Sequence, residues 1–123
     1  MREKPLFWIA SSKKDIKALP GIVQDKLGYA LHMAQIGEKH DSAKPLKGFA
    51  GAGVLEVVEN DDGDTYRAVY TVRFAQVVYV LHVFQKKSKS GIATPKQDID
   101  LIKARLKLAE GDYAQWQNQQ KKP

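Results

Sequence analysis

Residues 65–74 read TYRAVYTVRF, and the alternation within this run decides the fold of the chain. Aromatic and small apolar side chains stand at the even positions. The odd positions hold Arg67, Val69, Thr71 and Arg73. Successive side chains of a strand point to opposite faces of its sheet. The run therefore predicts a strand with a core face toward helices and an open face that carries the two arginines.

Two further strand-like runs, residues 54–60 and 77–85, flank this stretch. Asp61-Asp62-Gly63-Asp64 lies before it and predicts a tight hairpin, because Asp-Gly accepts the positive φ of a primed turn. Ala75-Gln76 lies after it and is short enough for a second two-residue turn. Consecutive short connections predict an antiparallel meander of three strands.

Helical patterns lie on both sides of the meander. Residues 6–9 form a short apolar run suited to a strand, and Ser12 is a candidate cap for a short helix that Pro20-Gly21 ends. The next helix carries apolar side chains three or four positions apart: Val23, Leu27, Ala30, Leu31 and Ala34. Residues 44–53, rich in Lys, Gly and Pro, are expected to form a loop.

The last helix is expected to begin at Thr94-Pro95, with threonine as its cap and proline at its first position. Its apolar stripe is Ile99, Ile102, Leu106, Ala109, Tyr113 and Trp116. Residues 117–123 are polar and are expected to fray. The sequence thus predicts a single α+β domain over residues 1–123. It has an N-terminal strand and an αα-hairpin on one face of an antiparallel sheet, plus a C-terminal helix.

Charge is distributed unevenly along the 123 residues, whose net charge is +6. Residues 65–97 contain no Asp or Glu, whereas residues 56–64 are acidic. A concentrated basic half favours a polyanionic partner, most often nucleic acid, although it also suits a solvated sheet face. The absence of cysteine excludes disulfides and thiolate chemistry. The apolar run near the N-terminus is too short for a signal or a membrane span, so a cytoplasmic protein is expected.

The expected register predicts a candidate site on the open face. A turn at Ala75-Gln76 sets Arg67 opposite Phe84 and Val69 opposite His82, so His82, Phe84 and Lys86 share the face of Arg67. Glu56 and Val58 of the preceding strand join them. Arginine binds phosphate, lysine or histidine moves protons, and an aromatic ring stacks on an unpaired base. The three histidines lack metal-ligand spacing, so no metal or cofactor is expected.

Several segments of the chain form an ordered set: Lys44-Pro45-Leu46-Lys47-Gly48-Phe49 with Gly53-Val54-Leu55-Glu56, then Thr65-Tyr66-Arg67-Ala68-Val69-Tyr70, then Leu81-His82-Val83-Phe84-Gln85-Lys86-Lys87-Ser88 leading to Thr94-Pro95. This set resembles phage-derived HigB-like toxins of the RelE/HigB superfamily, which belong to type II toxin–antitoxin systems. The match runs in order from about residue 6 to 108. The resemblance implies a RelE-like fold and a metal-independent endoribonuclease that cleaves mRNA, in many relatives on the ribosome. It also implies a cognate antitoxin encoded by the adjacent gene, often of the helix-turn-helix type.

Residue roles follow from the resemblance and the register together. Arg67, Lys86 and His82 are the expected catalytic residues, and RNA-binding is assigned to Lys47, Arg73, Phe84, Lys87 and Lys89. Relatives often read Glu-Leu-Arg where this chain has Glu56-Val57-Val58. The arginine missing at Val58 would have pointed to the active face, and Arg73 is the candidate substitute. The alternative is a non-catalytic RNA- or ribosome-binding module on the same scaffold.

Overall fold

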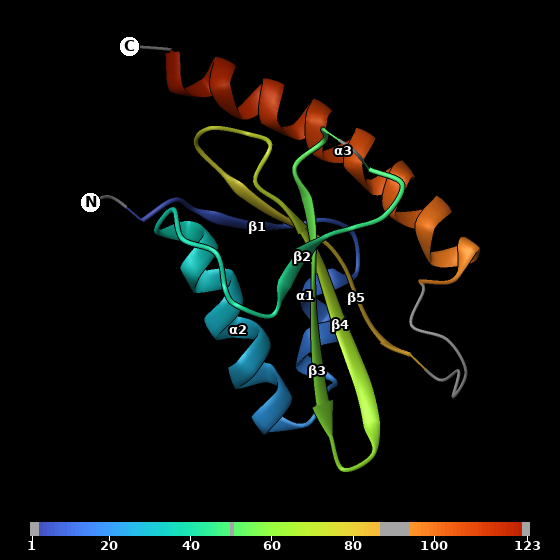
Figure 1. The fold of residues 1–123 in the computed structure, drawn as a ribbon. Helices are drawn as coiled ribbons and strands as arrows, with labels where there is room; N and C mark the ends of the chain where they lie inside the picture. The colour runs from blue at the N-terminus through green and yellow to red at the C-terminus, as the bar shows by residue number, and fades with distance from the viewer. Residues whose placement is uncertain (1–2, 50, 87–93, 122–123) are drawn as a thin grey trace.

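The computed structural model describes residues 3–49, 51–86 and 94–121 (Figure 1). Its centre is a five-stranded sheet in the order β1-β5-β4-β3-β2. Strands β3 (Val54–Asp61), β4 (Asp64–Thr71) and β5 (Val78–Lys86) form the expected antiparallel meander. At one edge, β1 (Leu6–Trp8) runs parallel to β5. At the other, β2 (Ala43–Pro45) pairs with β3 and overlaps the start of residues 44–53, where a loop was expected.

The two hairpin connections differ in how well the sequence predicted them. Asp61 pairs with Asp64, and Asp62 and Gly63 have φ of 50° and 83°, so the primed turn is confirmed. The turn at Ala75-Gln76 is wrong, because residues 72–77 all lie outside the strands. Phe74 and Val77 are buried, so this longer connection packs into the core.

A register shift between Val69 and Tyr70 reconciles the longer connection with the expected pairing. Arg67 lies opposite Phe84 and Val69 opposite His82, as predicted, whereas Tyr70 lies opposite Val80. A bulge of this kind places one extra residue on one strand. The face shared by Arg67 and His82 is therefore as the sequence predicted, although the turn that motivated it is absent.

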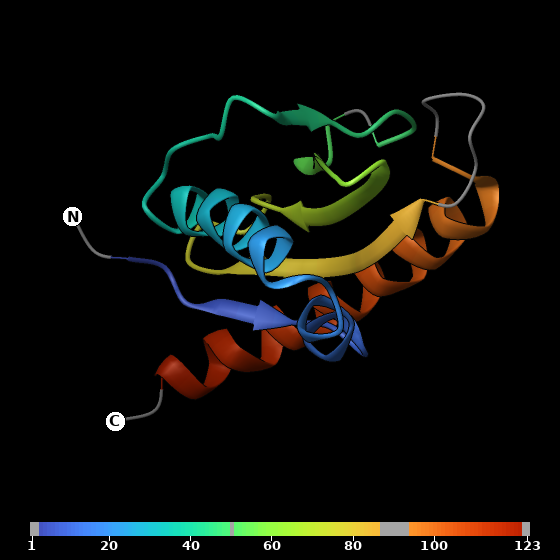
Figure 2. The ribbon, with the colours of Figure 1, turned by 90° about the horizontal axis from the view of Figure 1, so that it is seen from below.

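The first helical layer covers one face of the sheet. Helices α1 (Ser12–Lys17) and α2 (Gly21–Gln35) lie on the same side of it (Figure 2). The predicted apolar stripe of α2 is buried and packs against the core face of the meander. The tight break between the helices lies at residues 18–20. The αα-hairpin of the sequence analysis is thus confirmed.

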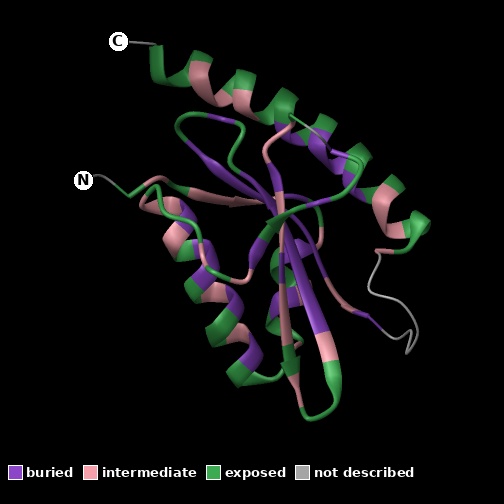
Figure 3. Cartoon of the chain, viewed as in Figure 1, coloured by how far each residue is buried: buried purple, intermediate pink, exposed green. Residues whose placement is uncertain are grey.

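The second helical layer is α3 (Lys96–Lys121), which crosses the opposite face of the sheet (Figure 2). Its stripe packs in one cluster with Val69, Tyr79 and Leu81 of the strands and with Leu46 and Phe49 of the loop after β2. The expectation that this face is open to solvent is therefore wrong. Val69 and Leu81 are apolar on that side, and α3 removes them from water (Figure 3).

Helix α3 also continues through residues 117–121, where fraying was expected. Its distal half is held by aromatic contacts: Trp116 stacks on Tyr113 and meets Phe7 of β1 edge to face, with ring centroids 6.2 Å apart. Tyr113 in turn contacts Phe74. These contacts anchor the helix close to its C-terminal end.

Because α3 covers the sheet, replacing a buried and an exposed aliphatic residue of this helix by alanine should have unequal effects on the free energy of unfolding. Ile102 is 0% exposed and Leu108 is 58% exposed. Ile102→Ala should lower the free energy of unfolding by about 2–5 kcal/mol, because it leaves a cavity between helix and sheet. Leu108→Ala should change it by less than about 0.5 kcal/mol. Urea unfolding followed by circular dichroism measures both, and equal effects would contradict the placement of α3.

Candidate active site

An ion pair on the covered face is the centre of the candidate site. A guanidinium nitrogen of Arg67 on β4 donates to Glu56 Oε1 on β3 at 2.7 Å, and both side chains are largely buried. The Thr94 hydroxyl, just before α3, donates to Glu56 Oε2 at 2.7 Å and lies 3.3 Å from the same Arg67 nitrogen. The hydroxyl expected to cap α3 is therefore engaged with the sheet, and it fixes the start of the helix against β3 and β4.

Lys86, the last residue of β5, lies near this ion pair. Burial lowers the pKa of its ammonium, the charge of Arg67 lowers it further, and the charge of Glu56 opposes the shift. A lysine with a lowered pKa releases its proton more readily than an ordinary one. The polar cluster formed by Glu56, Arg67, Lys86 and Thr94 therefore holds a carboxylate, a guanidinium and an amine suited to proton transfer.

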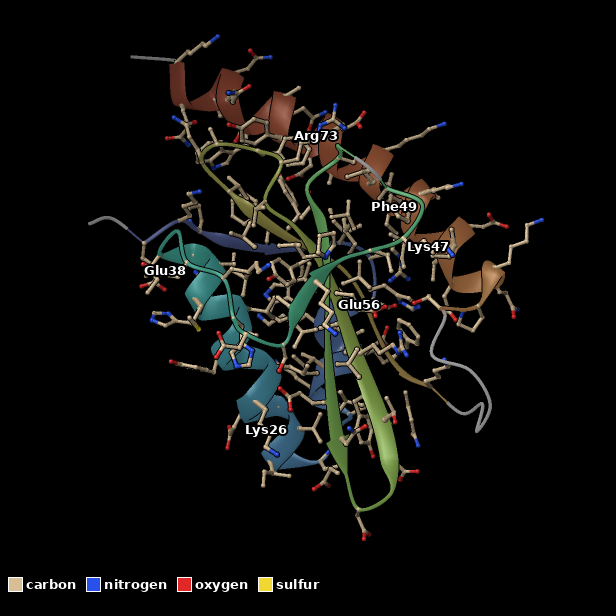
Figure 4. The ribbon with its side chains drawn as sticks, viewed as in Figure 1. Lys26, Glu38, Lys47, Phe49, Glu56 and Arg73 are labelled. Atoms are coloured by element: carbon tan, nitrogen blue, oxygen red, sulfur yellow. The ribbon has the colours of Figure 1, made fainter. Side chains whose placement is uncertain are left out.

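A groove of about 560 Å³ opens beside the polar cluster. Glu56 and Thr94 line it together with Pro45, Leu46 and Ile99, and Lys44, Lys47 and Lys96 are its exposed basic residues. We call it the lysine groove. Figure 4 shows Lys47 on the loop after β2, beside the first turns of α3, with Glu56 on the strand that borders them. Lys47, an expected RNA-binding residue, thus lies at the groove that Glu56 also lines.

His82 takes part in a second polar network beneath α3. Its Nε2 lies 2.8 Å from Asp98 Oδ1, and its Nδ1 lies 3.4 Å from a guanidinium nitrogen of Arg105. Arg105 also donates to the Leu81 carbonyl and to Ser11 Oγ. Because a guanidinium only donates, this arrangement fits the tautomer that carries its proton on Nε2. Both ring nitrogens of this expected catalytic residue are therefore engaged by α3.

The remaining expected RNA-binding residues are dispersed. Phe84 is partly buried and stacks on the His82 ring, with centroids 4.5 Å apart. Arg73 lies beyond the end of β4 and pairs with Glu110 of α3 at 2.6 Å, far from Lys47 along the helix (Figure 4). Arg73 thus faces α3, as Arg67 does, but it lies outside the strand, which ends at Thr71. Lys87 and Lys89 lie outside the described residues.

Three residues that sequence reasoning did not include complete these networks: Thr94, Asp98 and Arg105. Only Arg105 gave a usable signal, since it falls between Ile102 and Leu106 on an otherwise apolar stripe. A buried arginine requires partners. Its position therefore implied acceptors on the covered face. Asp98 and Thr94 gave none, because acidic and hydroxyl residues are common at helix starts for capping alone.

Residues 3–49, 51–86 and 94–121 hold no group of three or more His, Asp or Glu side chains placed to bind a metal ion. Within the same residues, no helix has the length and hydropathy needed to cross a membrane.

Comparison with known proteins connects this geometry to a family. The family described as "Phage derived protein Gp49-like" matches residues 14–107, which span the elements from α1 to the proximal half of α3. The chain belongs to this family. The family is of the RelE toxin type, so the resemblance found in the sequence is confirmed.

A solved structure supports the same fold. An arginine-to-alanine double mutant of the E. coli toxin RelE in the free state superposes with a TM-score of 0.52 at 22% identity. The match covers 67% of this chain and 82% of that chain. No curated protein matches the sequence. The α+β, RelE-like architecture expected from the sequence is therefore confirmed.

Burial of His82 predicts a pH dependence of stability. Burial lowers its pKa, and the Asp98 hydrogen bond only partly opposes this; the charge of Arg105 lowers it further and that of Asp15 raises it. The unfolded state, with a pKa of about 6.5, then binds more protons than the folded state. The contribution of His82 is complete above about pH 6.5 and is lost as the pH falls below it. Urea unfolding at pH 7.5, 6.5 and 5.5 should show this decline.

The His82→Gln variant should lose less stability than the parent between pH 7.5 and 5.5, although it should be less stable throughout. His32→Gln provides the matched control, because His32 is exposed on α2, and it should keep the parental pH dependence. An unchanged slope in His82→Gln would show that another group is responsible.

Proposed function

We propose that this chain is the toxin of a type II toxin–antitoxin system and acts as a metal-independent endoribonuclease on mRNA, with the ribosome as the setting for cleavage. The observation that carries the proposal is the polar cluster beside the lysine groove, two members of which, Glu56 and Thr94, line the groove itself. Three exposed lysines supply the positive charge that a phosphate backbone requires. The cluster beside them supplies groups for proton transfer and charge stabilisation.

The chemistry requires a proton acceptor, a stabilised phosphorane and a proton donor. The Glu56 carboxylate accepts the proton of a ribose 2′-hydroxyl, and the oxygen then attacks the adjacent phosphorus. Arg67 stabilises the charge that develops on the phosphate oxygens. The bond to the 5′-oxygen breaks as the Lys86 ammonium donates a proton to it. The products are a 2′,3′-cyclic phosphate and a 5′-hydroxyl.

His82 is a positioning residue in this proposal. Its ring nitrogens are engaged by Asp98 and Arg105, so it holds the first turns of α3 on the sheet. The same turns present Thr94 and Lys96 to the groove. The Asp98–His82 contact thereby helps to hold Thr94 beside Glu56. Of the two residues that the sequence assigned to proton transfer, Lys86 keeps the role of donor, and Glu56 is the acceptor.

A non-catalytic RNA- or ribosome-binding module is the second candidate, and Val58 favours it. Val58 lies directly opposite Arg67 on β3, where relatives often carry an arginine. The structure brings no replacement to this position from Arg73. A module of this kind would bind RNA through the lysine groove and leave the RNA intact.

Loss of the Arg67 guanidinium tests catalysis directly. Arg67→Ala should reduce cleavage of translated mRNA by about 10²–10³-fold, because a principal charge stabiliser is removed. Arg67→Lys keeps a cation beside Glu56, which guards against loss of the fold, and should still be strongly impaired because lysine lacks the planar fork. Mapping of transcript 5′ ends measures the effect.

Arg73→Ala is the matched control and should cleave within a few-fold of the parent. A folded Arg67→Ala protein that cuts at the parental rate would place the site elsewhere. Equal loss in Arg73→Ala would reinstate Arg73 as the substitute for the missing arginine. A parent that binds mRNA without cutting it would favour the second candidate.

The outer side of α3 is the proposed contact for the antitoxin. Leu101 and Leu108 lie two turns apart on one side of the helix, 36% and 58% exposed. Exposed apolar residues at this spacing suit an amphipathic partner segment, and the basic groove nearby attracts an acidic one. A helix-turn-helix protein encoded by the adjacent gene is the proposed partner.

Leu108→Asp should therefore weaken co-purification with that protein by at least about tenfold and should restore toxicity under co-expression, because a charge replaces an apolar contact. Ile22→Asp, at an exposed position of α2, is the control and should leave the complex intact. Undiminished neutralisation of Leu108→Asp would move the antitoxin contact away from α3.

A further inference from the structure

The lysine groove has two chemically different parts. Pro45, Leu46 and Ile99 form apolar walls, whereas Lys44, Lys47 and Lys96 carry charge at the exposed positions. Glu56 and Thr94 supply polar oxygen atoms between them. Binding of a phosphate backbone alone would require the lysines but no apolar walls.

The apolar walls come from two elements, the loop after β2 and the first turns of α3, and the fold fixes the position of both. Leu46 pairs its backbone N–H with the Val54 carbonyl at 3.0 Å, which continues the β2–β3 pairing into the loop. Leu46 and Phe49 are buried in the same cluster that Ile99 packs against, so the loop and the first turns of α3 share one core. The separation of the walls is therefore fixed by the fold.

We infer that the lysine groove seats one unstacked nucleotide of the RNA, with its base between Ile99 and the Pro45-Leu46 wall. This inference rests on the proposed function, since it assigns the seated nucleotide to the substrate of the same site. The phosphate lies against Lys47 and Lys96, and the ribose 2′-hydroxyl faces Glu56. A volume of about 560 Å³ is within the range of small-molecule sites.

The walls determine what kind of recognition the site performs. Aliphatic side chains contact the face of any base, so the groove distinguishes a nucleotide from a bare sugar phosphate more strongly than one base from another. A purine covers more apolar surface than a pyrimidine and gains more. The substrate class is therefore single-stranded RNA with one base turned out of its stack.

The test titrates the intact protein with AMP, UMP and ribose 5-phosphate, which differ in the base while keeping a sugar phosphate. Binding is followed by backbone amide NMR shifts, which also locate the ligand. AMP should bind about tenfold more tightly than ribose 5-phosphate, with UMP between them, and the shifts should concentrate at Leu46, Lys47 and Ile99. Equal affinities of AMP and ribose 5-phosphate, or shifts elsewhere, would overturn the inference.

Variants separate the two halves of the groove. Ile99→Ala should remove most of the advantage of AMP over ribose 5-phosphate, while Ile22→Ala, the same change on exposed α2, should preserve it. Lys47→Ala should weaken both ligands and reduce the salt dependence of binding. Preserved discrimination in folded Ile99→Ala would also overturn the inference.

Cleavage measured in parallel distinguishes the two proposals. If the protein cuts mRNA but binds AMP and ribose 5-phosphate equally, the proposed function stands and the inference that the groove seats a base is refuted. If AMP binds in the groove but mRNA stays intact, catalysis is refuted and the inference about the groove is supported.

Discussion

Burial of β4 and β5 on both faces is the constraint on which the rest of the structure depends. Residues from Tyr66 to Thr71 and from Val78 to Val83 are all buried. One face is covered by α1 and α2, and the other needs a cover of its own because Val69 and Leu81 lie there. Helix α3 is that cover, and its apolar stripe packs in one cluster with these two residues.

Covering this face with α3 also encloses its polar side chains. A buried charge without a partner costs several kcal/mol, so each must be compensated. Glu56 compensates Arg67, and Arg105 is held by the Leu81 carbonyl and Ser11. The packing of the helix therefore also encloses the polar cluster. Displacement of α3 would expose the apolar residues beneath it, draw Thr94 away from Glu56 and open the Glu56–Arg67 ion pair to water.

The sequence was sufficient to predict the elements that depend on local residue patterns. Alternation in β4 and the Asp62-Gly63 turn determined the meander, and the spacing of apolar residues determined α2 and α3. The pairing of Arg67 with Phe84 was predicted correctly, but from a two-residue turn that is absent. The bulge after Val69 restores the register that such a turn would have set. Pairing of β1 with β5 was not predictable, since it joins distant segments without a short connection.

The candidate site was only partly predictable, for a physical reason. Alternation shows that Arg67, His82 and Lys86 share a face, but it does not show what covers that face. Val69 on the same side was a clue that it is not solvated, whereas Leu81 reaches that side only through the bulge in β5. The roles of Thr94 and Asp98 depend on where the start of α3 lies over the sheet, which no local pattern determines.

The β3–β4 hairpin has a consequence for how the molecule meets its partners. Asp61, Asp62 and Asp64 are at its tip, whereas Lys44 and Lys47 lie alongside the opposite end of β3. This separation makes the hairpin a local dipole, negative at its tip and positive at the other end of β3. In the field of a polyanion such a dipole experiences a torque that turns the lysines forward and the aspartates away. If RNA is the ligand, as proposed, its diffusional encounters then begin with the lysine groove facing the strand.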